Sequence, residues 1–281
     1  MSVLEKLSEK NSVRRKADRR SDKIKHRSGA IEQWGAIVVS QALIDFATYV
    51  NFSILMRSKL LSLLSTIRLL GLCAAAFSIW LFAEIADEVL EQETTTLDTQ
   101  ILLALKNLHS PLLDQIMTGI TFLGEPISII SLCLLFGGIL WKQGRRAEAT
   151  TIAIAAGGSA LLNYILKGIF SRSRPALWDR IVDVGYYSFP SGHAMVSLVM
   201  YGILGYLMAT RFPKWRLAIA VLTMILVGAI GLSRLYLGVH WPTDVIAGYT
   251  AGIVWLVTCI LSLQVWRIYR SAKANSQELN F

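Results

Sequence analysis

The sequence predicts an all-α membrane protein, and three observations support this. Hydrophobic residues make up 54% of the 281-residue chain and charged residues only 17%, less than the roughly 25% that is usual in soluble domains. Mean hydropathy is +0.50. The apolar residues fall into several runs of about 20, the length of helix that crosses a bilayer. The composition therefore excludes an ordinary soluble enzyme, a disordered scaffold and a collagen-like rod.

The positive net charge of +9 could indicate nucleic-acid binding or basic cytoplasmic loops. In a membrane protein the second explanation is favoured, so we expect no nucleic-acid partner. The three cysteines, Cys73, Cys133 and Cys259, lie far apart inside apolar runs and without C-x-x-C spacing. We therefore expect them to be packing residues, not disulfide partners or zinc ligands.

The first 60 residues divide into two segments. Residues 1–30 hold ten lysines and arginines against four acids, and they have no apolar stretch typical of a cleaved signal peptide. They are either a flexible tail that binds anionic lipids or a solvated end with no role. Residues 31–60 are largely apolar but contain Asp45, which would cost roughly 2.5–3.5 kcal/mol at the bilayer centre. We predict an amphipathic helix in the interface or packed on the bundle, with a crossing as the alternative.

We predict six crossings, near residues 67–86, 124–141, 148–168, 193–210, 215–233 and 244–266. The second requires an argument, because residues 111–141 are mostly apolar and would form a helix of about 46 Å, longer than the roughly 30 Å hydrocarbon core. Gly124-Glu125-Pro126 supplies a break, so residues 112–123 are predicted to form a surface helix. A single tilted helix is the alternative. In the last crossing, Gly248-x-x-x-Gly252 permits close helix packing.

Charge sets the predicted orientation. The tail 1–30, the turns at 142–146 and 211–216, and the end after residue 267 are basic, whereas the predicted loop 87–110 is acidic. Six crossings place all the basic segments on one side, which the positive-inside rule identifies as the cytoplasm. We therefore expect cytoplasmic termini and insertion in the plasma (inner) membrane.

The predicted outer side breaks this pattern, because it also carries cations. These are Lys167, Arg172, Arg174 and Arg180 in the loop 167–192, and Arg234 in the next outer turn. An anionic ligand is the simplest reason for such a cluster.

Three short motifs lie at the outer ends of the predicted crossings. They are Lys167-x6-Arg174-Pro175, Pro190-Ser191-Gly192-His193 and Ser233-Arg234-x5-His240-x3-Asp244. Each motif alone is a weak signal, since lysine and arginine at crossing ends usually reach toward lipid headgroups. Together they place three cations, two histidines and a carboxylate at one membrane face.

These residue types suit a phosphate. Arg174 and Arg234 can each bind two phosphate oxygens, and Lys167 adds a point charge. The second motif opens a predicted helix, whose free N–H groups attract anions. There Gly192 would let the backbone approach the ligand, and Ser191 could donate its hydroxyl.

The histidines suit phosphoryl transfer. Asp244 could hold one imidazole nitrogen of His240 and leave the other free to attack phosphorus. His193, on the far side of the phosphate, could protonate the leaving group. This chemistry forms a phosphohistidine and needs no metal or other cofactor. A zinc site of two histidines and one aspartate is the alternative, which the surrounding cations disfavour.

The three motifs, in this order, resemble the signature of the type 2 phosphatidic acid phosphatase (PAP2) superfamily. Its pattern is K-x6-RP, PSGH and SR-x5-H-x3-D, and all eleven fixed positions are present between Lys167 and Asp244. The resemblance implies a six-helix bundle of the type shared with vanadium haloperoxidases, with His240 as nucleophile, Asp244 as its orienting partner and His193 as general acid. It also implies a phosphate-binding set, Lys167, Arg174, Ser191, Gly192 and Arg234.

The resemblance predicts a phosphatase domain over residues 61–270, followed by a cytoplasmic tail, 271–281; it does not cover the function of residues 1–60. The expected activity is hydrolysis of a lipid phosphomonoester or a polyprenyl pyrophosphate at the extracytoplasmic face. A lipid phosphotransferase would use the same site and differ in its acceptor. A transporter or binding protein is less favoured, because the ionisable residues lie at crossing ends and not at mid-membrane.

Five other polar positions complete the predictions. Glu125 is expected to cap a helix or pair with a cation. Arg172 and Arg180 are either peripheral substrate contacts or surface charges. Asn163 is expected to form an interhelical hydrogen bond. His109 has no partner pattern in the sequence and is expected to be a loop residue.

Overall fold

The structure is a computed structural model that describes residues 66–178, 182 and 185–278, together with positions 41, 46, 49 and 50. The predicted basic tail 1–30, Arg180 and nearly all of the 31–60 segment lie outside these residues. The chain divides into two compact units, and the larger one, Leu63–Ile268, contains the three motifs. The predictions for the site can therefore be examined within one unit.

The described residues form helices joined by loops and contain no strand. In chain order the elements are α2 (Thr66–Glu91), α3 (Thr95–Lys106), α4 (Pro111–Phe122), α5 (Pro126–Lys142), α6 (Arg146–Phe170), α7 (Gly192–Arg211), the short 3-10 helix η2 (Pro213–Trp215), α8 (Arg216–Tyr236) and α9 (Pro242–Glu278). The predicted all-α fold is confirmed.

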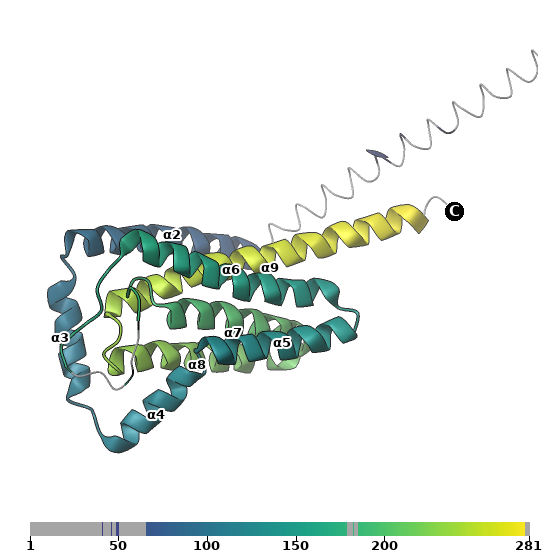
Figure 1. The fold of residues 1–281 in the computed structure, drawn as a ribbon. Coiled ribbons are helices and arrows are strands. Elements are labelled where there is room, and N and C mark those ends of the chain that lie inside the picture. Colours follow the sequence, from purple (N-terminus) through teal and green to yellow (C-terminus); the bar gives the residue numbers. More distant parts are fainter. Residues whose placement is uncertain are drawn as a thin grey trace, which may run out of the picture. The chain divides into compact units, whose positions relative to one another are not determined.

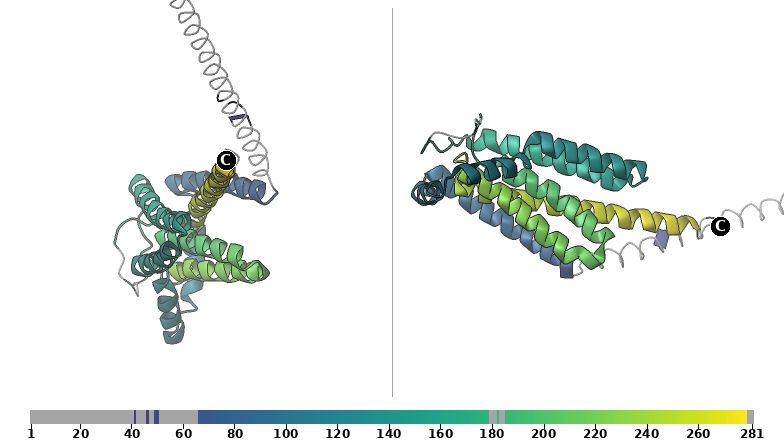
Figure 2. Two further views of the ribbon diagram at one scale, coloured as in Figure 1. Left: turned by 90° about the vertical axis from the view of Figure 1, so that its right-hand side faces the viewer. Right: turned by 90° about the horizontal axis from the view of Figure 1, so that it is seen from below.

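Most of the long helices run along one common direction, and α3 lies across one end of them (Figure 1). Two further views show the same bundle from its end and from below (Figure 2). Within the described part of the chain, five helices are long and apolar enough to cross a membrane. The bent pair α4 and α5 would make a sixth crossing.

The predicted break between α4 and α5 is confirmed. Helix α4 ends at Phe122, and Pro126 occupies the first turn of α5, where its missing N–H costs nothing. The two helix axes differ by 45°. Glu125 stands at the N-cap position of α5 without a side-chain capping bond, so its side chain is left for another partner.

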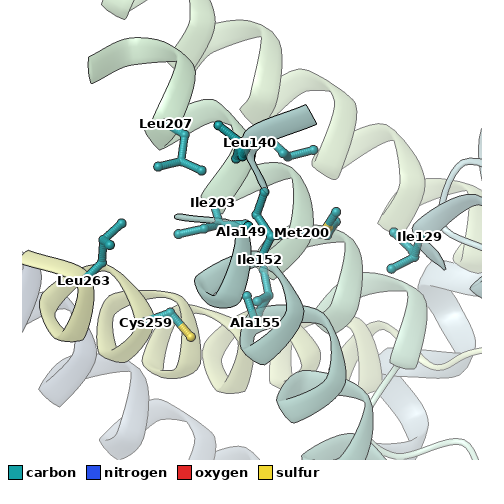
Figure 3. Packing of buried hydrophobic residues seen from close by; sticks show 12 residues of the cluster. Ile129, Leu140, Ala149, Ile152, Ala155, Met200, Ile203, Leu207, Cys259 and Leu263 are labelled. Atoms are coloured by element: carbon teal, nitrogen blue, oxygen red, sulfur yellow. The ribbon is translucent and has the colours of Figure 1, made fainter. Parts of the chain in front are cut away.

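The core lies between α5, α6, α7 and α9, as Figure 3 shows. Ile152 of α6 and Met200 and Ile203 of α7 are fully buried there. Glycines allow α9 to approach α7. A Cβ at Gly248 would lie 2.7 Å from the carbonyl oxygen of Ser191, too close for any other residue. The predicted packing role of this glycine pair is confirmed.

The cysteines are free thiols. Cys259 is part of the core and Cys133 packs against it, as predicted for packing residues. Cys73 is exposed on α2, so the packing prediction is wrong for this residue. Large apolar side chains such as Leu217 and Leu134 are likewise exposed, which suits a surface covered by lipid.

The predicted acidic loop 87–110 is wrong for most of its length. Helix α2 continues to Glu91, and α3 occupies Thr95–Lys106. The apolar residues of α3 are too few for a crossing, so the segment had the appearance of a loop in the sequence. Asp98 and Leu102, one helical turn apart, are its buried residues, so α3 is held against the bundle by one face.

Candidate active site

The three motifs meet because helix direction alternates. Helices α6 and α8 end, and α7 and α9 begin, at the end of the bundle where α3 lies (Figure 1). Lys167 lies in the last turn of α6 and Arg234 in the last turn of α8. Ser191 is the N-cap of α7, and its backbone N–H donates to the carbonyl oxygen of Asp244 in the first turn of α9 at 2.9 Å.

His240 is held at both ring nitrogens. Nδ1 lies 3.2 Å from Oδ2 of Asp244, and Nε2 lies 3.2 Å from Nη1 of Arg174. A carboxylate only accepts hydrogen bonds and a guanidinium only donates them. The proton of the neutral ring is therefore on Nδ1, and Nε2 carries the lone pair.

His240 stays neutral because of its surroundings. Its side chain is 2% exposed, and burial disfavours the charged imidazolium. The positive charges of Arg174, Arg234, Lys167 and His193 act in the same direction. Burial first, and then these charges, lower the pKa of His240 well below its ordinary value of 6.5. Nε2 is thus available as a nucleophile over the physiological pH range.

Two of the predicted cations contact backbone carbonyl oxygens of the segments that precede α7 and α9. Nζ of Lys167 donates to the carbonyl oxygen of Tyr187. Nε of Arg174 donates to the carbonyl oxygen of Tyr186 at 3.0 Å, and its Nη1 to that of Val239 at 2.7 Å. These neutral carbonyl groups satisfy the donors without supplying a full negative charge. An arriving anion would bind these donors more strongly.

Arg234 is the most deeply placed cation of the site, with 1% of its surface exposed. Its Nη1 donates to Oγ1 of Thr121 in α4 at 2.6 Å. Its Nε has no hydrogen-bond partner among the described residues. Because a buried unpaired donor is costly, this position favours an additional acceptor such as a phosphate oxygen.

Asn163 forms the predicted interhelical contact. Its Nδ2 donates to the carbonyl oxygen of Pro190 at 3.1 Å, across from α6 to the start of α7. A Cβ at Gly192 would lie 2.9 Å from Oδ1 of Asn163. Packing on α6 therefore favours this glycine, whether or not a ligand approaches it. The hydroxyl of Ser191 accepts from the N–H of Ala194 at 3.5 Å and can still donate.

His193 pairs with Glu125 from the break between α4 and α5, at 3.1 Å between Nε2 and Oε1. Glu125 had been expected to cap a helix or pair with a cation, and its partner is this histidine. The side chain of His193 is 15% exposed and that of Glu125 39%. This pair is therefore more open than that of His240 and Asp244.

An apolar cavity of about 490 Å³ adjoins His193. Its polar end is formed by Asn163, Gly192 and His193. Its walls come mainly from α5 and α6, among them Ile129, Ile130, Leu134, Ala153 and Ala160. The cavity can therefore take an aliphatic group next to the phosphate-binding residues.

Arg172 is not a surface charge, so this one of its two predicted roles is wrong, and the peripheral contact with substrate stays a prediction. Its side chain is 13% exposed and makes ion pairs with two carboxylates, Asp244 at 2.8 Å and Asp98 at 2.9 Å. Asp98 was not predicted as a site residue. The only signal in the sequence is an acidic residue one turn before the apolar residues of α3, which alone does not identify a partner.

His109 lies in the loop between α3 and α4, as predicted, and it has a partner there that the sequence did not indicate. Its Nε2 lies 2.9 Å from the carbonyl oxygen of Tyr236, and the two rings stack with centroids 4.3 Å apart. It therefore fixes the segment between α3 and α4 to α8. No recorded interaction links it to His240 or His193.

Comparisons with known proteins agree with this geometry. The model of the PAP2 superfamily matches residues 148–268. Phosphatidylglycerophosphatase B of Bacillus subtilis is 30% identical over 150 residues, which cover 52% of this chain and 73% of that protein. An undecaprenyl-diphosphatase of Sulfolobus acidocaldarius is 42% identical over 135 residues, 45% of this chain and 59% of that protein.

The fold is also similar to that of a solved protein. A crystal structure of a transmembrane PAP2-type phosphatidylglycerolphosphate phosphatase from Bacillus subtilis superimposes with a TM-score of 0.63 and 26% identity. The match covers 66% of this chain and 94% of the other.

Proposed function

Because the chain belongs to the PAP2 superfamily and is a membrane phosphatase, we propose that it hydrolyses a phosphomonoester or diphosphate of a lipid through a phosphohistidine. The observation that carries the proposal is the state of His240. Asp244 holds its Nδ1–H, its Nε2 keeps a lone pair, and three cations act on the ring.

The reaction has two steps. Nε2 of His240 attacks phosphorus, so an N–P bond forms as the P–O bond to the lipid breaks, and His193 gives a proton to the leaving oxygen. Asp244 stabilises the imidazolium that results. In the second step His193 takes a proton from water as the water oxygen attacks phosphorus. The N–P bond breaks, phosphate leaves, and Nε2 of His240 recovers its lone pair.

The cations would stabilise the charge on the three transferring oxygens. Arg174 would exchange its carbonyl partners and Nε2 of His240 for phosphate oxygens. The unpaired Nε of Arg234 would take one more oxygen, and Lys167 would add its charge. Ser191 and the first N–H groups of α7, beginning at Gly192, would supply neutral donors.

The apolar cavity beside His193 supports a lipid substrate over a free sugar phosphate, since it could hold the first part of a hydrocarbon chain. Relatives of the chain carry names that point to phosphatidylglycerol phosphate and to undecaprenyl diphosphate. A substrate with a phosphate or diphosphate on an acyl or prenyl lipid fits both the cations and the cavity.

The proposed orientation has the site facing outside the cytoplasm and the termini inside, in the plasma (inner) membrane. The turns that carry Lys142, Arg145 and Arg211 join helices at the end of the bundle opposite the site, and basic turns favour the cytoplasmic side. The tail 1–30 would then face the anionic inner leaflet.

The proposal is tested with purified protein in detergent, a panel of lipid phosphates and diphosphates, and phosphate release as the measurement. Release without any added alcohol acceptor separates hydrolysis from phosphotransfer. Turnover should persist in a chelator and stop with saturating vanadate. Loss of turnover in the chelator, or full turnover with vanadate, would contradict the proposed site.

A further inference from the structure

A chain of polar groups leads from Asp244 to α3, outside the three motifs. Nη1 of Arg172 donates to Oδ1 of Asp244 at 2.8 Å, and Nη2 donates to Oδ2 of Asp98 at 2.9 Å. The side chain of Asp98 is 1% exposed. Both terminal nitrogens of the Arg172 guanidinium group are thus bound to a carboxylate, and Asp98 binds the nitrogen that faces away from Asp244.

Asp98 also holds the start of α9. Its Oδ1 accepts from the backbone N–H of Thr243 at 3.1 Å, and its Oδ2 accepts from the hydroxyl of Thr243 at 2.6 Å. Thr243 is the second residue of α9, where a backbone N–H has no partner within the helix. A carboxylate is favourable at this end of a helix. Asp98 therefore caps, from α3, the turn that carries Asp244.

The two oxygens of Asp244 have different partners as a result. Oδ1 accepts from Arg172, whereas Oδ2 accepts from Nδ1 of His240 and from the N–H of Trp241, at 3.2 and 2.9 Å. Rotation of the carboxylate would break the bond to Arg172. The network thus directs Oδ2 toward His240.

Charge adds a second effect. If Asp244 were the only acidic partner of Arg172, the guanidinium would compete with the imidazolium of His240 for the negative charge of that carboxylate. Asp98 supplies a second carboxylate to Arg172, so that the charge of Asp244 is left for His240. Buried networks of this kind act strongly because the local dielectric is low.

We propose that Asp98 is a positioning residue for phosphohistidine formation, acting through Arg172 and Thr243 to hold the Asp244 carboxylate on Nδ1 of His240. The inference rests on the proposed nucleophilic role of His240. It gives α3, which lies outside the motifs, a part in the chemical step.

The test compares Asp98→Asn with Asp114→Asn in the full chain. Asp114 is an aspartate of α4 that accepts from the Tyr236 hydroxyl at 2.5 Å, so its variant loosens an interface without touching the network. At metal sites, residues that orient the metal ligands typically contribute about 10- to 100-fold to affinity or activity, and we take the same range for Asp98. We expect kcat of Asp98→Asn to fall by that factor, with KM unchanged within about threefold, and kcat of Asp114→Asn to stay near wild type.

Rapid-quench trapping of the phosphoenzyme shows whether the loss of kcat arises in the formation of the phosphohistidine. The rate of its formation should fall in Asp98→Asn as kcat does. A wild-type rate in folded Asp98→Asn, or an equal loss in Asp114→Asn, would overturn the proposal. His240→Ala distinguishes a failure of the proposed function from a failure of the role of Asp98. Turnover in His240→Ala would refute the proposed function. An inactive His240→Ala together with a fully active Asp98→Asn would refute only the role of Asp98.

A second pair of variants decides the matter if Asp98→Asn does not fold. Thr243→Val keeps the shape of the side chain but removes the hydroxyl that bridges Asp98 and Arg172, and Thr243→Ser keeps that hydroxyl. We expect a fall in kcat of about fivefold or more in Thr243→Val and recovery in Thr243→Ser. Equal kcat values in the two variants would overturn the proposal.

Discussion

The two histidines of the site lie in unlike surroundings. His240 and its partner Asp244 are 2% and 0% exposed, and Arg172 fixes the carboxylate from behind. His193 and its partner Glu125 are 15% and 39% exposed, and His193 borders an apolar cavity. The first pair is rigid and dry, whereas the second is open on one side.

This difference matches two chemical tasks. A nucleophile must keep one nitrogen oriented, with its lone pair free, which a buried and fully bonded partner ensures. A group that gives a proton to a lipid oxygen and then takes one from water must be reached by both. The contrast therefore assigns attack to His240 and proton transfer to His193, and the following predictions test that assignment.

The largest expected effect is that of His240→Ala. Removal of the nucleophile should lower kcat by at least about 1,000-fold, because the proposed reaction begins with the bond between Nε2 of His240 and phosphorus. Phosphate release is the measurement, and the thermal transition in detergent checks that the variant is folded. A folded variant that still forms phosphoenzyme at the wild-type rate would refute attack by His240.

His193→Ala should lower kcat on a lipid phosphate by about 100- to 1,000-fold, the usual contribution of an acid–base group. A substrate with a good leaving group, such as p-nitrophenyl phosphate, does not need the proton in the first step. Its initial burst of nitrophenol should stay fast, while the steady state slows because hydrolysis of the phosphohistidine lacks its base. Equal loss of the burst and of lipid turnover would contradict this role.

The pH dependence tests the surroundings of His240. Only the neutral ring can attack, and its pKa lies well below 6.5, so kcat/KM should fall about tenfold per pH unit only below that lowered pKa. Measurement with two substrates whose phosphate groups differ in pKa shows whether the acid limb comes from the enzyme or from the substrate. Arg174→Gln removes the strongest of the charges that lower the pKa, so the acid limb should move up toward 6.5. A limb that stays in place would contradict the electrostatic account.

Much of this arrangement could be predicted from the sequence. Alternating helix direction requires the ends that carry Lys167, His193 and Arg234 to meet at one face. Gly124 and Pro126 mark the break between α4 and α5, because one is a weak helix former and the other cannot continue a helix. These features depend on local chemistry and on the order of the chain.

The remaining features depend on tertiary contacts that local pattern does not contain. Asp98 reaches Arg172 only because α3 lies across the end of the bundle. In the sequence Asp98 is one of five acidic residues in the segment 87–110, which has the appearance of a loop. Arg172 falls at an unspecified position of the first motif, so its spacing gives no indication of a partner. The contact between His109 and Tyr236 spans 127 residues and is equally absent from any local signal.

We expect the smallest effect from a change in the more exposed pair, His193 and Glu125. In Glu125→Gln the amide oxygen can still accept from Nε2 of His193, but it lacks the charge that makes such a bond about twice as strong. We expect kcat on a lipid phosphate to fall only about three- to tenfold. The matched change Asp244→Asn alters a fully buried pair and should cost at least about 100-fold, because a misdirected imidazole cannot attack. Equal losses in these two variants would mean that the proton-transfer pair is as rigid as the nucleophilic one, and the division of tasks between the histidines would then have no structural basis.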